Sequence, residues 1–139
     1  MVTGASQPLR VLVVEDETLM RWSITETLAE RGHSVLEASS ASTALGALHE
    51  TSEPVDVVLL DFRLPDSNGL GLLADIRRMS PESAVVMMTA YGTPEMAQGA
   101  LDLGACTVLS KPFDMHRLES LVREAAEARS RNGTPPPVS

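Results

Sequence analysis

Polar and charged residues stand at the ends of four apolar runs in this chain of 139 residues. Residues 15–17 are Glu, Asp and Glu and follow one run, and Asp61 ends a second run. Thr89 and Lys111 follow two further runs, and Lys111 is the only lysine of the chain. Two carboxylates about 4 Å apart repel each other by about 4 kcal/mol at an effective dielectric constant near 20. If these positions meet in the folded chain, they need a bound cation or a retained proton.

The residue types fit a site that binds a cation together with a phosphate. Carboxylate oxygens favour Mg²⁺ or Mn²⁺, and Mg²⁺ keeps coordination positions for water and phosphate oxygens. Lys111 would supply a point charge to that phosphate, and the Thr89 hydroxyl would donate to it. Taken singly, each residue has a simpler interpretation, such as a loop residue for Asp61 or a solvated surface for Glu17. Their shared placement favours one common site.

Five apolar runs alternate with segments of helical spacing. The longest runs are apolar at consecutive positions, which is typical of parallel strands covered on both faces. The pattern predicts an α/β protein of the flavodoxin-like class, a (βα)5 doubly wound parallel sheet with strand order 2-1-3-4-5. The carboxyl ends of its strands then share one edge, where the acidic residues face Asp61. The expected strands are 11–14, 34–36, 55–60, 84–88 and 107–109, and the expected helices are 18–31, 42–50, 68–79, one beginning at Thr93, and 114–129.

Charge, cysteine content and hydropathy exclude several classes of protein. The net charge of −8 is unfavourable next to a phosphate backbone, so we expect no direct binding of nucleic acid. The single cysteine, Cys106, excludes an internal disulfide, and we expect it to be a small buried side chain. The apolar runs are too short to span a membrane, and the first residues do not resemble a signal peptide. We therefore expect a cytoplasmic location and no membrane contact.

The ends of the chain differ in composition from its middle. Residues 1–8 show no periodicity, and we expect a flexible lead-in there, followed by one domain over residues 9–129. Residues 130–139 end in Gly-Thr-Pro-Pro-Pro-Val-Ser, which is typical of a linker. This Pro-rich segment is expected to be either a loose tail or a linker to a further domain.

Four stretches of sequence carry a resemblance to a known family. They are Val-Val-Glu-Asp-Glu (13–17), Leu-Leu-Asp-Phe-Arg-Leu-Pro-Asp-Ser-Asn-Gly (59–69), Met-Met-Thr-Ala-Tyr-Gly (87–92) and Ser-Lys-Pro-Phe-Asp (110–114). In order and spacing they resemble the receiver domain of two-component response regulators. Their amino-acid sequences are most similar to those of the receivers of enhancer-binding transcription activators of the nitrogen-regulation type.

The resemblance implies a role for each residue of the cluster. Asp61 would accept a phosphoryl group from a sensor histidine kinase, Lys111 would pair with the phosphoryl oxygens, and Thr89 would rotate inward to hydrogen-bond them. Such chemistry rests on positioning and charge neutralisation. The Mg²⁺ ligands would be the carboxylates of Glu15, Asp16 and Asp61 and the backbone carbonyl of Arg63. Glu15 stands where the family more often has Asp, and a longer side chain can still reach the metal.

The implied output is regulatory rather than enzymatic in the ordinary sense. Phosphorylation would shift a two-state equilibrium of the face built from residues 93–129, through which a homodimer would form, and the output would be transcription. Alternatively, the chain would be a stand-alone receiver that acts by protein binding or phosphorelay.

Three positions bear on how the switch would work. Val108 stands where most members have an aromatic residue that moves with the threonine, so we expect looser coupling or another reporter of the active state. Arg63 and Tyr91 occupy positions that tune autodephosphorylation in the family. A bulky Tyr91 would shield the aspartyl phosphate from water.

Two other functional classes fit the sequence less well. A phosphohydrolase of the haloacid-dehalogenase type needs a second Asp two residues after its nucleophile, where this chain has Arg63. A flavin- or nucleotide-binding protein of flavodoxin-like fold needs a Gly-rich phosphate loop after the first strand, which is absent from the sequence.

Overall fold

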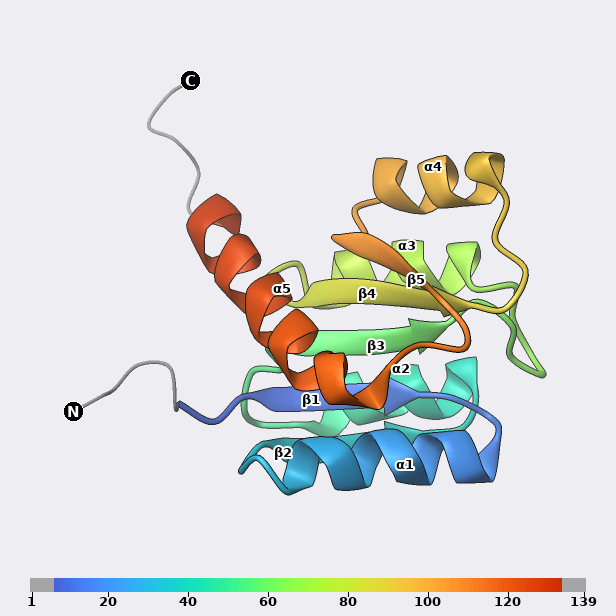
Figure 1. Cartoon of the computed structure of the whole chain (residues 1–139). Helices are drawn as coiled ribbons and strands as arrows, with labels where there is room; N and C mark the ends of the chain where they lie inside the picture. The colour runs from blue at the N-terminus through green and yellow to red at the C-terminus, as the bar shows by residue number, and fades with distance from the viewer. Residues whose placement is uncertain (1–6, 134–139) are drawn as a thin grey trace.

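The sheet of this protein has the predicted topology. A computed structural model describes residues 7–133, with side chains through residue 129. Five parallel strands form one sheet in the order β2-β1-β3-β4-β5, which confirms the expected strand order (Figure 1). The strands are β1 (Arg10–Val14), β2 (Ser34–Ala38), β3 (Val57–Asp61), β4 (Ala84–Thr89) and β5 (Thr107–Ser110).

Five α-helices connect or follow the strands, and residues at the ends of two of them explain where these helices begin or stop. The Thr93 hydroxyl caps α4 by accepting a bond from the Met96 N–H, and Pro94 opens the helix. Gly32 follows α1 with a φ of +91°, the conformation expected at a glycine stop. The helices are α1 (Thr18–Ala29), α2 (Ala41–Glu50), α3 (Leu70–Met79), α4 (Pro94–Asp102) and α5 (Leu118–Gly133).

The last helix differs from its expected bounds. Asp114 does cap this segment, because its carboxylate accepts the N–H of His116. A single 3₁₀ turn (Met115–Arg117) follows this cap, so α5 begins four residues later than predicted, at Leu118 rather than Asp114, and it continues to Gly133. Residues 1–6 of the expected lead-in and 134–139 of the expected linker lie outside the described residues, and the domain bounds remain predictions.

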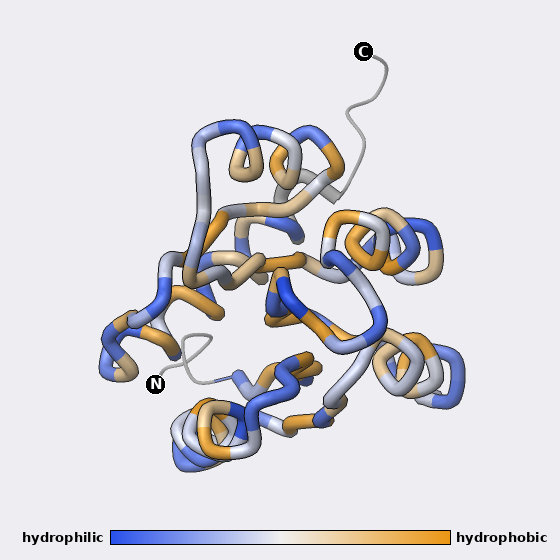
Figure 2. Tube along the Cα trace, turned by 90° about the vertical axis from the view of Figure 1, so that its right-hand side faces the viewer, coloured by the Kyte–Doolittle hydropathy of each residue, from blue (hydrophilic) through white to orange (hydrophobic). Residues whose placement is uncertain are grey.

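Helices cover both faces of the sheet. Helices α1 and α5 pack on one face through residues such as Ile24, Leu28 and Val122. Helices α2, α3 and α4 pack on the other through residues such as Leu73 and Ile76. Figure 2 looks onto the carboxyl ends of the strands, and the apolar sides of the helices turn toward the central sheet. Every residue of β3 and β4 is buried, which explains why these strands are apolar up to their last residues, Asp61 and Thr89.

The structure corrects one expectation about burial. Cys106 is exposed rather than buried, and its neighbour Ala105 takes the buried position. Cys106 directly precedes β5, and its N–H donates to the Val85 carbonyl of β4. Because β5 is an edge strand, it has a neighbouring strand on one side only. Among the described residues, no helix combines the length and the hydropathy that a membrane span requires.

Candidate functional site

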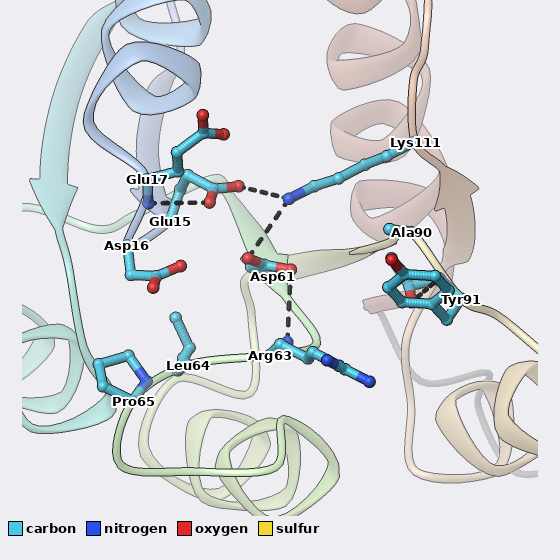
Figure 3. Close-up of a pocket in the computed structure, with 11 residues that line it drawn as sticks. Glu15, Asp16, Glu17, Asp61, Arg63, Leu64, Pro65, Ala90, Tyr91 and Lys111 are labelled. Carbon is cyan, nitrogen blue, oxygen red and sulfur yellow. Dashed lines mark hydrogen bonds and ion pairs between the residues drawn. The ribbon is translucent and has the colours of Figure 1, made fainter.

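Three carboxylates meet at the carboxyl edge of the two central strands. Glu15 and Asp16 directly follow β1, and Asp61 is the last residue of the neighbouring strand β3. One carboxylate oxygen from each of the three lies within 4.8 Å of the others. In Figure 3, the carboxylates of Asp16 and Asp61 point toward each other, whereas Glu17 points away. The predicted acidic cluster therefore forms, with Glu17 outside it.

Lys111 is the counter-charge of this cluster. It follows β5, and its Nζ lies 2.7 Å from Glu15 Oε1 and 3.3 Å from Asp61 Oδ2 (Figure 3). Burial disfavours the charged lysine, but the hydrogen bonds and negative charges of Glu15 and Asp61 outweigh it and raise the pKa of Lys111. The lysine is therefore a permanent cation that already touches the predicted phosphoacceptor.

Asp61 lies in an environment that penalises its charge. Its side chain is largely buried, and burial together with the negative charge of Glu15 raises the pKa of Asp61 to about 6. Lys111 and the N–H of Arg63, which donates to Asp61 Oδ1 at 3.3 Å, offset only part of this effect. A cation that binds beside Asp61 would therefore stabilise its ionised carboxylate.

Glu15 is fixed from three directions. Its side chain is only 1% exposed and accepts both the Lys111 ammonium and, at 3.1 Å, the N–H of Glu17. Its backbone carbonyl accepts a bond from Arg21 Nη1 at 2.8 Å, and Arg21 also pairs with Glu37 at the end of β2. The longer glutamate side chain is thus used to reach across to the lysine.

These groups line an open pocket of about 390 Å³. Thr89, the last residue of β4, is buried there, and its hydroxyl accepts the N–H of Tyr91 at 3.1 Å. Tyr91 is 73% exposed at the pocket mouth, and the guanidinium carbon of Arg63 lies 5.0 Å from the centre of its ring. The pocket brings together all six predicted site residues, namely Glu15, Asp16, Asp61, Arg63, Thr89 and Lys111.

Two residues that hold the loops around the pocket were not singled out from the sequence. Arg21 binds a backbone carbonyl, and the carboxylate of Asp66 accepts two backbone N–H groups of α2. Backbone partners leave no pattern in side-chain types, so no sequence signal pointed to either residue. The peptide bond between Lys111 and Pro112 is cis.

The fold and the site together define a class of protein. A doubly wound parallel sheet with three carboxylates and one lysine at its switch-point edge is the arrangement that the resemblance to receiver domains implies. The sequence profile of the response regulator receiver domain matches residues 11–123, and the chain belongs to this family.

Similar proteins confirm the resemblance to receivers of transcription activators. Response regulator protein PilR of Pseudomonas aeruginosa is 38% identical over 130 residues, which cover 93% of this chain and 28% of PilR. Sporulation initiation phosphotransferase F of Bacillus subtilis is 31% identical, covering 87% of this chain and 96% of that protein. The beryllofluoride-activated NtrC4 receiver domain dimer superposes with a TM-score of 0.79 at 32% identity, covering 86% of this chain and 98% of that one.

Proposed function

We propose that this domain accepts a phosphoryl group on Asp61 from a phosphohistidine of a sensor histidine kinase. An Asp61 oxygen forms the new bond to phosphorus while the phosphorus–nitrogen bond breaks, and the released imidazole takes up a proton. The observation that carries the proposal is the contact of Lys111 Nζ with Asp61 Oδ2 inside a cluster of three carboxylates. Positioning and charge neutralisation are the main sources of catalysis in phosphoryl transfer.

The acidic cluster suits Mg²⁺ or Mn²⁺. We assign as ligands the carboxylates of Glu15, Asp16 and Asp61, with the Arg63 carbonyl as a fourth group from the protein. Oxygen ligands of this kind are those that hard divalent cations prefer. When bound, the cation would neutralise charge on the phosphoryl oxygens. Lys111 would then exchange its carboxylate partners for the phosphoryl group, and the Thr89 hydroxyl would turn from the Tyr91 N–H toward the same oxygens.

The signal would leave the domain through the face of residues 93–129. The dimer of the activated NtrC4 receiver supports a homodimer, and we assign the contact between its copies to this face. The chain spans 28% of PilR and 25% of the DNA-binding transcriptional regulator NtrC of Azospirillum brasilense, so a transcriptional output would depend on parts of such proteins that this chain does not match. The match to 96% of the sporulation phosphotransferase favours a second version, a stand-alone receiver in a phosphorelay. In both versions the domain works in the cytoplasm and is a phosphoacceptor rather than an ordinary enzyme.

Intact-mass analysis after incubation with acetyl phosphate tests the proposal. We expect one added phosphoryl group on the wild-type protein in Mg²⁺, none in EDTA, and none on Asp61→Asn under either condition. Glu17→Gln is the matched control, because Glu17 lines the same pocket but its side chain points away from the cluster, and it should label like the wild type. A metal-independent adduct, or labelling of Asp61→Asn, would disprove the assignment.

The ring of Tyr91 should slow the loss of the phosphoryl group. The Arg63 guanidinium stacks on this ring at the pocket mouth, and such a pair contributes about 0.5–1 kcal/mol at an exposed site. We therefore expect a phosphorylated state that lasts minutes, and a loss about two- to fivefold faster in Tyr91→Ala. Tyr91→Phe retains the ring and should match the wild type. Equal lifetimes for all three proteins would rule out shielding by the ring.

A further inference from the structure

The turn that follows the phosphoacceptor strand is anchored to a distant helix. Asp66 lies between β3 and α3, and its carboxylate reaches the first residues of α2. Oδ1 accepts the N–H of Ala41 at 2.8 Å, and Oδ2 accepts the N–H of Ser42 at 3.1 Å. These two bonds lower the pKa of Asp66, so the carboxylate stays ionised near neutral pH.

Asp66 completes the capping of α2. The first four N–H groups of a helix have no partner within the helix. In α2, the Ser40 hydroxyl accepts the N–H of Thr43 at 3.1 Å, and the Thr43 hydroxyl accepts the N–H of Ser40 at 3.1 Å. The remaining two N–H groups are those that bind Asp66. The capping box of Ser40 and Thr43 therefore satisfies two of the four N–H groups, and the carboxylate of Asp66 satisfies the other two.

Asp66 lies in a tight turn that begins beside the phosphoacceptor position. Leu64 and Ser67 exchange backbone hydrogen bonds at 3.3 and 3.4 Å, which places Asp66 at the tip of a tight turn. Leu64 is buried in the core, and Arg63, at the base of the turn, donates its N–H to Asp61. The segment of residues 63–66 is thus bound to Asp61 at its start, through the Arg63 N–H, and to α2 at its other end, through the Asp66 carboxylate.

We propose that Asp66 is a positioning residue that sets the affinity of the pocket for its divalent cation. By tying the tip of the turn to α2, it holds the Arg63 backbone carbonyl in place beside the three carboxylates. The inference rests on the metal site of the proposed function. Residues that orient a ligand from behind change metal affinity by about 10–100-fold when they are replaced, and a carbonyl held through the backbone should lie at the lower end.

The test compares Asp66→Ala with Ser40→Ala. Both remove a cap from the same end of α2 and should lower the urea midpoint of unfolding to a similar extent. Only Asp66 also holds the turn. We expect the Mg²⁺ concentration at half-saturation, measured by calorimetric titration, to rise about tenfold in Asp66→Ala and to stay unchanged in Ser40→Ala. Asp66→Asn keeps one acceptor oxygen and should give an intermediate value.

The rate of labelling at saturating Mg²⁺ distinguishes a loss of metal affinity from a loss of the phosphoryl-transfer reaction itself. The rate of labelling by acetyl phosphate in Asp66→Ala should return to the wild-type rate when Mg²⁺ is saturating. Equal Mg²⁺ affinity in Asp66→Ala and the wild type, or an equal shift in Ser40→Ala, would overturn the inference. If the wild type binds Mg²⁺ with this dependence on Asp66 but takes no phosphoryl group, the proposed function fails and the inference stands. A wild-type protein that binds no Mg²⁺ overturns both.

Discussion

The Asp61→Asn protein should be more stable than the wild type near neutral pH when divalent cations are removed, by about 1–2 kcal/mol. The wild-type carboxylate is penalised by burial and by the charge of Glu15, which raise its pKa from 3.8 to about 6. At about 1.4 kcal/mol per pKa unit, this shift sets an upper limit of about 3 kcal/mol. Water enters through the open pocket and reduces that limit. The asparagine amide carries no charge, and its oxygen can still accept the N–H of Arg63.

The sign of the pH dependence follows from the raised pKa. Below the unfolded value of 3.8, Asp61 is protonated in both states and its charge costs nothing. As the pH rises from there to about 6, the unfolded chain ionises first, so the folded wild type loses stability relative to Asp61→Asn. Above about 6 the penalty is complete. The gap between the two proteins should therefore be large near neutral pH and small in acid.

Urea unfolding in EDTA at about pH 4 and about pH 7.5 measures this gap. Adding Mg²⁺ near neutral pH should stabilise the wild type more than Asp61→Asn, because the cation relieves the repulsion. Glu17→Gln removes an exposed charge from the same pocket and should change stability by less than about 0.5 kcal/mol. An Asp61→Asn protein that is less stable than the wild type near neutral pH would refute this account of the site.

Gly69→Ala should destabilise the domain by about 3–5 kcal/mol. Gly69 precedes α3 with a φ of +82° and a ψ of −49°, a conformation that a side chain rarely permits. A Cβ atom there would lie 2.5 Å from the carbonyl oxygen of Phe62, the residue after Asp61. The clash is with backbone, so relief requires movement of the turn. The free energy of unfolding in urea measures the loss.

Gly71→Ala is the matched control for this substitution. Gly71 lies two residues further along, inside α3, and a Cβ there would make only an ordinary contact of 3.6 Å with the Asn68 side chain. Alanine is the better helix former, so this variant should gain about 0.5–1 kcal/mol. Similar effects of the two substitutions would show that the close approach to Phe62 does not limit the fold.

The sequence contained most of what determines the sheet and the pocket. The runs that became β3 and β4 are apolar up to their last residues, and this pattern specifies strands covered on both faces. Once the strand order was predicted, the placement of Asp61 opposite Glu15 and Asp16 followed from the shared carboxyl edge. Lys111 could be expected nearby for the same reason.

Other features depend on contacts that residue types do not reveal. Asp66 binds backbone N–H groups 25 and 24 residues away in the chain, and Arg21 reaches the site by binding a backbone carbonyl, so no side-chain partner in the site points to either residue. The exposure of Cys106 depends on its place before an edge strand, which its neighbours in sequence do not indicate. The late start of α5 arises because Asp114 caps a 3₁₀ turn first.

The hydrogen bond between Glu15 and Lys111 joins residues that are 96 positions apart. During synthesis from the N-terminus, the three carboxylates are all present once residue 61 has been made, but their only internal cation arrives with residue 111. Until β5 has joined the edge of the sheet, the acidic loops repel each other without relief. The proposed pocket is therefore incomplete until β5 has joined the sheet. Under the proposed function, a chain that has not reached this stage would not accept a phosphoryl group, because it lacks the residue that completes the pocket.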